Sequence, residues 1–345
     1  MLKYLSLFSG IGAFESALTN LGVNYEVVNY CEIDKYASKS YSAIHGVPET
    51  KNLWDITKVN VFNLPKPNEV DLVTYGFPCQ DISLAGKQKG LFNDDGSLTR
   101  SGLFFEALKV IEYCKPKVAI AENVKNLTGK KFATQFETVL KSLEEAGYNN
   151  YWKVLNAKDY GIPQNRERVF IVSIRKDVDT EMFEFPKPYS LEKRLKDFLE
   201  PHVDEKYFIS KALNMRLTEN YIQYDNSGKG YNSQAARLYY QDGLCPTQPA
   251  NNAGDKTQIV LEDKENVKKG YIEAYEGDSV DLRIRKLTPK ECYRLMGFSD
   301  EEFERAENVP TSNTQLYKQA GNSIVVDVLE ELFCMMLDEK GEFHL

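Results

Sequence analysis

The chain has 345 residues, of which 42% are hydrophobic and 27% charged, a composition that fits a folded globular protein and excludes a disordered or fibrous one. No apolar run approaches the roughly 20 residues of a membrane-spanning helix, and the first ten residues lack the basic and long apolar regions of a signal peptide, so we expect a cytoplasmic protein without a membrane partner. The net charge of −8 argues mildly against a nucleic-acid partner, but residues 283–294 are rich in basic side chains, which leaves a basic cleft open.

Strand-like and helix-like patterns alternate through the first 175 residues. Short apolar or β-branched runs predict strands at 4–8, 25–33, 69–77, 117–124 and 168–175. Apolar residues at helical spacing predict helices at 13–22, 34–44, 101–114 and 132–147. This alternation predicts the α/β class, with a doubly wound, Rossmann-like and mostly parallel sheet that binds ligands at the carboxyl ends of its strands.

The character of the chain changes near residue 183. Two prolines there precede a segment, about 186–280, that is richer in Tyr, Asn, Gly and Gln. We expect loops at 226–234 and 248–258, and helices again at 288–298 and 322–337. The pattern predicts a second, smaller domain with irregular β structure.

The cysteines and histidines form no motif of their own. No two cysteines make a CxxC pair and no histidine lies near them at ligand spacing, so we expect neither a metal site nor a disulfide framework. Most of the six cysteines should be small buried hydrophobic side chains, and the three histidines should be structural or incidental.

The stretch LFSGIGAFE, residues 7–15, carries two glycines between the first strand and the first helix. Gly10 and Gly12 let the backbone pass close to a ligand, and the helix start offers free N–H groups. Glu15 stands where a third glycine would accommodate a pyrophosphate. Glu32 follows Gly12 by twenty residues, at the end of the second strand, which suits a carboxylate that holds ribose hydroxyls. Together they indicate a nucleoside-type cofactor rather than NAD.

Asp55 is predicted at a third strand end, in LWDI (53–56), where its carboxylate would accept from an adenine amino group. A turn or cap aspartate is the alternative reading of the same residue, and the sequence favours neither.

The stretch GFPCQDIS, residues 76–83, places Cys79 directly after the third clear strand, at the mouth of the sheet. Pro78 fixes the backbone there, and the loop that follows runs about 23 residues, a length that is usually functional. A packed, inert cysteine is the alternative. No histidine lies in this motif, which argues against a protease or acyltransferase. Glu122, at the end of the next strand, is the candidate acid, and a thiol beside an acid suits addition of the thiolate to C6 of a pyrimidine while the acid engages N3.

Six stretches carry a family resemblance, in order: LFSGIGAFE, GFPCQDIS, AENV, QNRERVFIV, RKLTPKECYRLMGF and QAGNSIVVDVL. In order and spacing they resemble the motifs of DNA (cytosine-5)-methyltransferases of the prokaryotic or phage type, over nearly the whole chain. The resemblance implies the S-adenosylmethionine-dependent methyltransferase fold. It implies a catalytic and cofactor-binding large domain at 1–185 plus 315–345, and an inserted, smaller target-recognition domain with hinge helices at 186–314.

The same resemblance implies the reaction and the partners. The enzyme would methylate cytosine-5 at specific sites in double-stranded DNA, after flipping the base out of the helix at a cost of a few kcal/mol. S-adenosyl-L-methionine would be the methyl donor and S-adenosyl-L-homocysteine the product. We expect a monomer, and the resemblance allows a cognate restriction endonuclease as a partner.

Residue roles follow from the motifs. Cys79 would be the covalent nucleophile and Glu122 the partner of N3 and the exocyclic amine. Arg168 and Arg166 would hold the cytosine O2 and the closed loop. The supporting residues would be Pro78, Asn123 and Gln164. The cofactor site would be lined by Phe8, Gly10, Gly12, Glu32, Ile33, Asp55 and Asn322. The DNA contacts would come from Gln80, Ser83, Lys87, Lys89 and Thr247.

The chain departs from the family pattern at two positions. Ile33 stands where relatives often carry an aromatic side chain that stacks on adenine, and Gln248 follows Thr247 where relatives often carry Leu or Ile.

Three other functions are alternatives to this interpretation. A tRNA cytosine-5 methyltransferase would carry a Cys-Phe-Thr stretch that this sequence lacks. A catalytically silent DNA-binding module would have lost the nucleophile, yet Cys79, Glu122 and Arg168 are all present. An NAD-dependent oxidoreductase fits the fold alone and fails on the third glycine.

Overall fold

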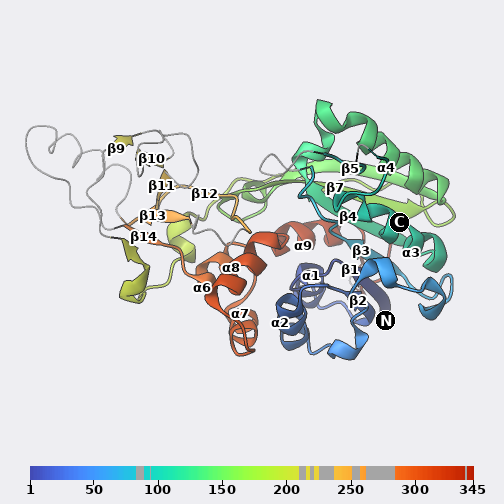
Figure 1. Ribbon diagram of the computed structural model, residues 1–345, viewed down its shortest axis with the longest axis horizontal. Coiled ribbons are helices and arrows are strands. Elements are labelled where there is room, and N and C mark those ends of the chain that lie inside the picture. Colours follow the sequence, from blue (N-terminus) through green and yellow to red (C-terminus); the bar gives the residue numbers. More distant parts are fainter. Residues whose placement is uncertain are drawn as a thin grey trace, which may run out of the picture.

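The computed structural model describes residues 1–82, 89–93, 95–209, 215–217, 221–224, 237–250, 257–261, 284–338 and 340–345. It contains a large sheet and a smaller sheet at opposite ends of the molecule, with the C-terminal helices between and beneath them (Figure 1). Every helix in the described part of the chain is too short or too polar to span a membrane.

The large sheet has six strands in the order β2-β1-β3-β4-β7-β5. The four at one side are parallel, and β7 runs antiparallel to both β4 and β5. The strands are β1 (Leu2–Leu7), β2 (Tyr25–Cys31), β3 (Leu72–Tyr75), β4 (Val118–Val124), β5 (Tyr148–Asn156) and β7 (Glu167–Arg175). The predicted α/β class and mostly parallel sheet are confirmed.

Helices cover both faces of this sheet, because side chains along each buried strand alternate between two hydrophobic cores. On β1, Tyr4 contributes to one core and Leu5 to the other, and both are fully buried. The first core includes residues of α1 and α2, and the second those of α3 and α4. These helices are α1 (Ala13–Asn20), α2 (Lys35–His45), α3 (Phe104–Cys114) and α4 (Ala133–Glu145).

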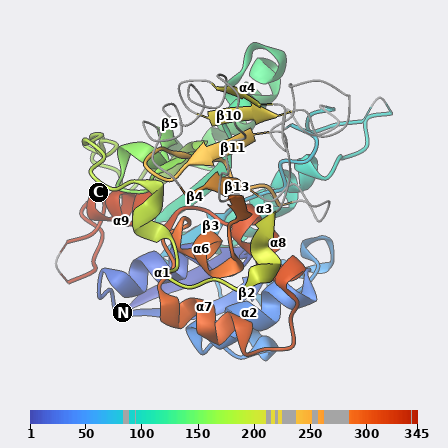
Figure 2. The ribbon, with the colours of Figure 1, turned by 90° about the vertical axis from the view of Figure 1, so that its left-hand side faces the viewer.

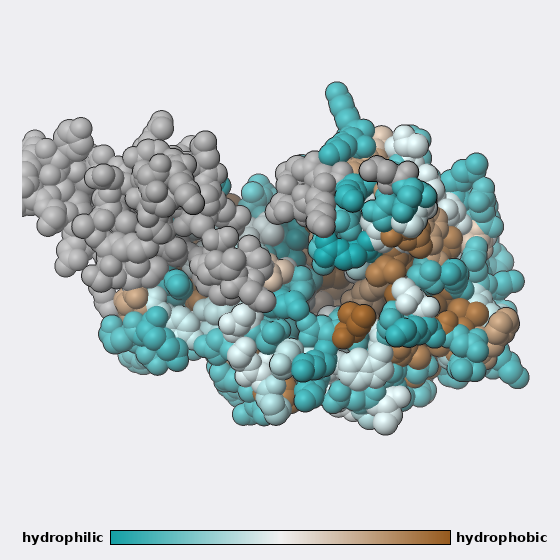
Figure 3. Space-filling model, in the orientation of Figure 1, coloured by the Kyte–Doolittle hydropathy of each residue, from teal (hydrophilic) through white to brown (hydrophobic). Residues whose placement is uncertain are grey.

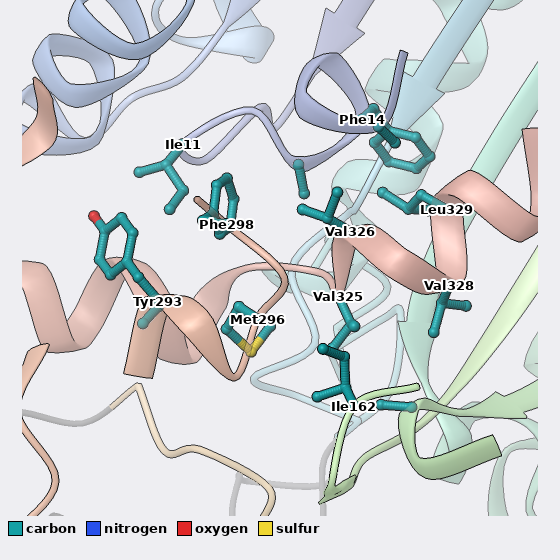
Figure 4. Close-up of a cluster of buried hydrophobic side chains, with 14 of the residues drawn as sticks. Ile11, Phe14, Ile162, Tyr293, Met296, Phe298, Val325, Val326, Val328 and Leu329 are labelled. Atoms are coloured by element: carbon teal, nitrogen blue, oxygen red, sulfur yellow. The ribbon is translucent and has the colours of Figure 1, made fainter. Parts of the chain in front are cut away.

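Four further helices complete the first core from the C-terminal end of the chain: α6 (Pro289–Arg294), α7 (Asp300–Glu307), α8 (Asn313–Asn322) and α9 (Val326–Cys334). Helix α9 packs on α1, where the rings of Phe14 and Phe333 meet edge to face at 6.2 Å. Figure 4 shows Phe14 beside Val326 and Leu329, with Ile11 and Phe298 in the same cluster. The C-terminal helix therefore returns to the start of the chain, beside the first glycine turn.

The smaller sheet has the order β8-β14-β13-β11-β10-β9 and is antiparallel except between β11 and β13. Figure 2 looks onto this sheet, with β10, β11 and β13 above α6. The strands are β8 (Phe208–Ile209), β9 (Met215–Leu217), β10 (Tyr221–Tyr224), β11 (Arg237–Tyr240), β13 (Gln258–Val260) and β14 (Ile284–Lys286). The predicted loop at 226–234 and most of that at 248–258 lie outside the described residues.

A two-strand ladder joins the smaller sheet's segment to the large body. Strand β12 (Cys245–Pro246) pairs in parallel with β6 (Gln164–Asn165), just before β7 begins. The motif QNRERVFIV therefore starts at this junction and continues into the large sheet.

The strand expected to end at Asp55 is not formed. Tyr30 and Asn52 make an isolated parallel bridge, and the chain then turns. Asp55 caps a short 3₁₀ helix, Ile56–Lys58, by accepting from the backbone N–H of Thr57 at 3.1 Å. LWDI has too few residues beyond the bridge to continue the sheet, so a polar cap ends it.

Candidate active site

The predicted site residues gather at one edge of the large sheet. Strands β1, β2, β3 and β4 are parallel, so their carboxyl ends lie together, and Gly10, Glu32, Cys79 and Glu122 each lie at or just after one of them. Figure 3 shows hydrophobic surface, in brown, gathered on the large body in the right half of the view.

Cys79 is half-buried on the turn after β3. Burial raises the pKa of its thiol and the charge of Glu122 raises it further, whereas Arg168 and Arg166 lower it. Of the other cysteines, Cys334 is exposed on α9 and the remaining four are buried. The thiol at 79 is therefore the one that combines partial access with an acid and two guanidinium groups nearby.

Glu122 and Arg168 form an ion pair in which Nε of the arginine lies 3.0 Å from Oε1 of the carboxylate. The β4–β7 register explains the pair: Glu122 lies opposite Phe170, so Arg168, two residues earlier on β7, projects from the same face. Burial raises the pKa of the Glu122 carboxyl, and the charges of Arg168 and Arg166 oppose that rise. The carboxyl therefore lies near the thiol, largely removed from solvent and close to the positive charges of two guanidinium groups.

Two asparagines from the end of β4 hold the turn that carries Cys79. Asn123 is buried and donates through Nδ2 to the carbonyl of Phe77 at 3.0 Å. Asn126 donates to the carbonyl of Ile82 at 2.5 Å. Pro78 and Cys79 lie between these two anchored carbonyls. The Glu-Asn-Val motif predicts a role for Asn123 but not for Asn126, whose only signal is its place three residues after Asn123.

The loop after this turn is more ordered at its ends than its length suggested. Asp81 is buried, accepts from the backbone N–H of Arg100 at 3.1 Å and takes a second contact from that residue's guanidinium at 3.5 Å. Phe92 and Leu98 form an antiparallel bridge. The loop was predicted to be structureless, but its described residues make regular contacts, and Asp81 and Arg100 join its two ends.

Arg166 and Gln164 lie at the junction between the two sheets, and the charge of Arg166 also acts on Glu122. The guanidinium of Arg166 is 3% exposed, and it donates to the carbonyl of Ser323 at 2.5 Å and to that of Gly321 at 3.0 Å. It also reaches the carbonyl of Gln248 at 3.4 Å. Gln164 donates to the carbonyl of Leu295 at 2.7 Å and accepts from the N–H of Gln248 at 3.1 Å. Both side chains therefore bind main chain from three distant segments.

The glycine turn after β1 leaves open space beside an anchored acid. Gly10 has a φ of 57°, and a Cβ there would meet nothing within 4 Å. Its N–H donates to Oε2 of Glu32 at 2.9 Å, while Oε1 accepts from the N–H of Asp34 at 2.7 Å. Burial raises the pKa of Glu32 to about 7. An open backbone surface beside a fixed carboxylate fits a nucleoside with free hydroxyls.

The other predicted cofactor residues differ in their surroundings. Gly12 has a φ of 84°, and a Cβ there would lie 2.1 Å from Nε2 of His45, so this glycine is required for packing. Phe8 has a left-handed φ of 53°. Ile33 is 70% exposed, and Asn322 is exposed at the end of α8.

Lys318 is a contact to this edge that the sequence did not reveal. From α8, its Nζ reaches Oδ2 of Asp34 at 2.5 Å. Asp34 also caps α2, so the last motif and the end of β2 are joined by one ion pair.

The predicted DNA-contacting residues are only partly described. Gln80 and Lys89 are exposed, and Thr247 donates to the carbonyl of Asn165 at 2.8 Å. Ser83 and Lys87 lie outside the described residues. Among the residues that are described, no three His, Cys, Asp or Glu side chains gather as a metal ion would require.

Comparison with solved structures identifies the class to which this fold belongs. The structure resembles the Dnmt2 methyltransferase of S. pombe with a TM-score of 0.67 at 22% identity, over 96% of this chain and 97% of that one. It resembles a mutant DNMT2 of Spodoptera frugiperda with a TM-score of 0.70, also at 22% identity, over 97% and 99%. The fold is that of the S-adenosylmethionine-dependent methyltransferases.

Sequence comparison identifies the family. The model of the C-5 cytosine-specific DNA methylases matches residues 2–337. The orphan methyltransferase M.SPBetaI of Bacillus phage SPbeta is 34% identical over 96% of each chain. The type II methyltransferase M.HhaI of Haemophilus parahaemolyticus is 35% identical over 95% of this chain and 92% of its own. The chain belongs to the C-5 cytosine-specific DNA methylase family and is a methyltransferase.

Proposed function

We propose that this enzyme methylates C5 of a cytosine flipped out of double-stranded DNA, at a specific site. The observation that carries the proposal is the cluster of Cys79, Glu122 and Arg168 at the carboxyl edge of the sheet, with the thiol close enough for both charges to act on its pKa. A thiol, a buried acid and a guanidinium are what addition to a pyrimidine ring requires, and the family to which the chain belongs supports that substrate.

The residues divide the chemistry between them. The Cys79 thiolate adds to C6 of the ring, and Glu122 engages N3 and the exocyclic amine. Burial raises the pKa of Glu122, which favours its protonated form, so that N3 can take a proton as the electrons of the C5–C6 bond shift. C5 then becomes an enamine carbon and takes up a methyl group. Loss of the C5 proton to solvent, expulsion of the Cys79 thiolate and return of the N3 proton to Glu122 restore the aromatic ring.

Arg168 is proposed to contact the cytosine O2 while it pairs with Glu122. A guanidinium has five donors, so one side of the group can bind the carboxylate and another the base. Arg166 and Arg168 also favour the Cys79 thiolate, which must form before the thiol can add. Pro78, Asn123 and Gln164 would hold the geometry.

The cofactor of this family and fold is S-adenosyl-L-methionine, which when bound supplies the electrophilic methyl group and leaves as S-adenosyl-L-homocysteine. The residues present fit it: Glu32 would accept from the ribose hydroxyls, and the open surface at Gly10 would face the nucleoside. The rest of the site would be lined by Phe8, Gly12, Ile33, Asp55 and Asn322. Residues 1–185 plus 315–345 would form the catalytic domain and 186–314 the inserted domain that reads the DNA.

The nucleophile is tested by Cys79→Ser. The variant should bind duplex DNA and transfer labelled methyl groups at least about a thousandfold more slowly, because a hydroxyl is a far weaker nucleophile. Cys334→Ser, at the exposed cysteine on α9, is the matched control and should behave as the parent enzyme. Turnover like that of the parent in the Cys79 variant would refute the assignment.

Duplex DNA containing 5-fluorocytosine tests the covalent step. With fluorine at C5 there is no proton to lose, so the parent enzyme should remain attached to the DNA and Cys79→Ser should not.

The same transfer assay with tRNA in place of DNA tests the substrate: methylated tRNA and untouched DNA would replace this proposal by the tRNA alternative. Bisulfite sequencing of DNA from expressing cells identifies the recognition site, which any cognate restriction endonuclease would share.

A further inference from the structure

We propose that Trp54 supplies the aromatic surface for the adenine of the methyl donor, in the place that Ile33 leaves without one. This inference rests on the proposed function, because it extends the same cofactor site. It names a binding residue that none of the motifs contains.

The backbone of Trp54 is the first observation. Five non-glycine residues in the described chain have positive φ, and three of them are Asn68, Lys115 and Glu181. The other two are aromatic, Phe8 at 53° and Trp54 at 60°. A bulky residue adopts the left-handed conformation only where its surroundings impose it, and such strain gathers at ligand sites. Both strained aromatics belong to the edge that carries Gly10 and Glu32.

The hydrogen bonds around Trp54 show what imposes this conformation. Its N–H donates to Oδ1 of Asn52 at 2.8 Å, and its carbonyl accepts from Sγ of Cys31 at 3.1 Å. The same Asn52 accepts from the N–H of Glu32 at 3.0 Å and donates to its carbonyl at 2.9 Å. One buried amide therefore fixes both the proposed ribose-binding acid and the turn that carries the indole.

The side chain of Trp54 is not used for packing as a core tryptophan would be. It is 40% exposed, and among the described residues it makes no aromatic contact. Ile33, which follows Glu32 directly, is 70% exposed. Two large apolar side chains with exposed surface thus belong to the segments around the acid that would hold the ribose, Ile33 next to it in the chain and Trp54 joined to it through Asn52. A flat adenine ring attached to that ribose is the ligand that both can cover.

The chemistry favours adenine over other occupants. Stacking between an indole and a base is strong and tolerates small differences in ring position. An aliphatic side chain can cover the opposite face of the ring without competing for it. Strain at Trp54 is then explained, because a relaxed backbone would not keep the indole beside the end of β2.

The chain provides a direct optical test, because it has only two tryptophans. The other, Trp152, lies on β5 at the opposite end of the sheet order and packs edge-on against Phe136 with ring centroids 4.9 Å apart. The variant Trp152→Phe therefore leaves Trp54 as the sole indole. Titration with S-adenosylhomocysteine should quench its emission with saturation, and L-homocysteine, which lacks adenine, should not.

Affinity is measured in parallel by calorimetry. Trp54→Gly should weaken S-adenosylhomocysteine binding about tenfold, the order expected for one lost base–aromatic stack. Glycine suits a φ of 60°, so this variant should fold at least as well as the parent. Trp54→Phe should recover most of the affinity, and duplex DNA binding should be unchanged in both.

The outcomes separate this inference from the proposed function. If the parent binds S-adenosylhomocysteine and Trp54→Gly binds it equally well, or if the emission of Trp54 stays constant through saturation, the inference is overturned and the cofactor site stands. Weaker DNA binding with unchanged cofactor affinity overturns it in favour of a DNA contact. If the parent itself does not bind S-adenosylhomocysteine, the proposed cofactor site fails and the inference with it.

Discussion

At the scale of single residues, the sequence predicted chemistry better than contacts. Cys79, Glu122 and Arg168 were named from motif positions, and the structure places the thiol under the influence of both charges. The guanidinium of Arg166 is buried on main-chain carbonyls, and its charge also lowers the pKa of Cys79 and of Glu122. Arg166 lies just before β7, where the strand pattern no longer sets its direction, so only the tertiary fold decides what its guanidinium contacts. Their roles toward the base stay predictions.

Glu32 gives a prediction about pH. Its pKa is raised to about 7 by burial, and the hydrogen bonds from the backbone N–H groups of Asp34 and Gly10 oppose that rise. A raised carboxyl pKa means that the folded enzyme holds this proton, and that stability is lost as the pH rises from about 4.5 towards about 7. Ribose hydroxyls donate to the carboxylate form, so affinity for S-adenosylhomocysteine should fall by up to about tenfold per pH unit below that pKa.

Calorimetry between about pH 6 and about pH 8 measures this dependence, with the upper range as the plateau. Glu32→Gln cannot titrate, so it should bind more weakly at high pH and show a nearly flat profile. An equal slope in the parent and in this variant would contradict the assignment of the titrating group.

At the scale of elements, periodicity found the buried strands and helices and missed the edges. Strand β5 was not predicted, because it borders the sheet and carries exposed Trp152 and Lys153 among polar residues. The strand at LWDI was wrong, since only Asn52 bridges to β2. A short apolar run does not reveal whether another strand is available to pair with it. A long alternation of strands and helices does, because each strand in such a sequence pairs with other strands of the same series.

The turn after β3 gives a prediction at this scale. Asn126→Ala removes the donor to the Ile82 carbonyl, so the turn that carries Cys79 keeps only the anchor at Asn123. We expect a loss of about 1 kcal/mol in the free energy of unfolding and a severalfold fall in kcat, because the thiol is less firmly placed.

Asn60→Ala is the matched control for that variant. Asn60 also makes one local bond, in which its Oδ1 accepts from the N–H of Phe62 at 3.1 Å, but it lies in another turn. It should cost similar stability without lowering kcat. Equal kcat losses in the two variants would show that the Asn126 effect is general destabilisation.

At the scale of the whole molecule, the sequence predicted an α/β body and a change of character near residue 183, but not the joints between the parts. The division into 1–185 plus 315–345 and 186–314 stays a prediction. Helices α6 and α7 belong to the same hydrophobic core as α1 and α2, and Ser16 donates to Glu302 at 2.5 Å. Contacts between residues so far apart leave no local pattern.

A prediction about the contacts between the two sheets and the C-terminal helices concerns Arg166. Arg166→Met leaves the carbonyls of Gly321, Ser323 and Gln248 without this donor, so the free energy of unfolding should fall by about 3 kcal/mol. Chemical denaturation measures the loss. Arg194→Met, at an exposed arginine, should change it by less than about 0.5 kcal/mol. If both variants lose the same amount, Arg166 does not join the parts.

The packing of α9 on α1 has a consequence for synthesis on the ribosome. The face of α1 that carries Phe14 is synthesised long before its partners Val326, Leu329 and Phe333, which follow it by about 300 residues. Until α9 is synthesised, that apolar face has no helix of its own chain to pack against. Chaperones or transient partners must shield it from solvent in the meantime. A prematurely terminated product would keep the face uncovered, which would mark it for degradation before it could modify the genome.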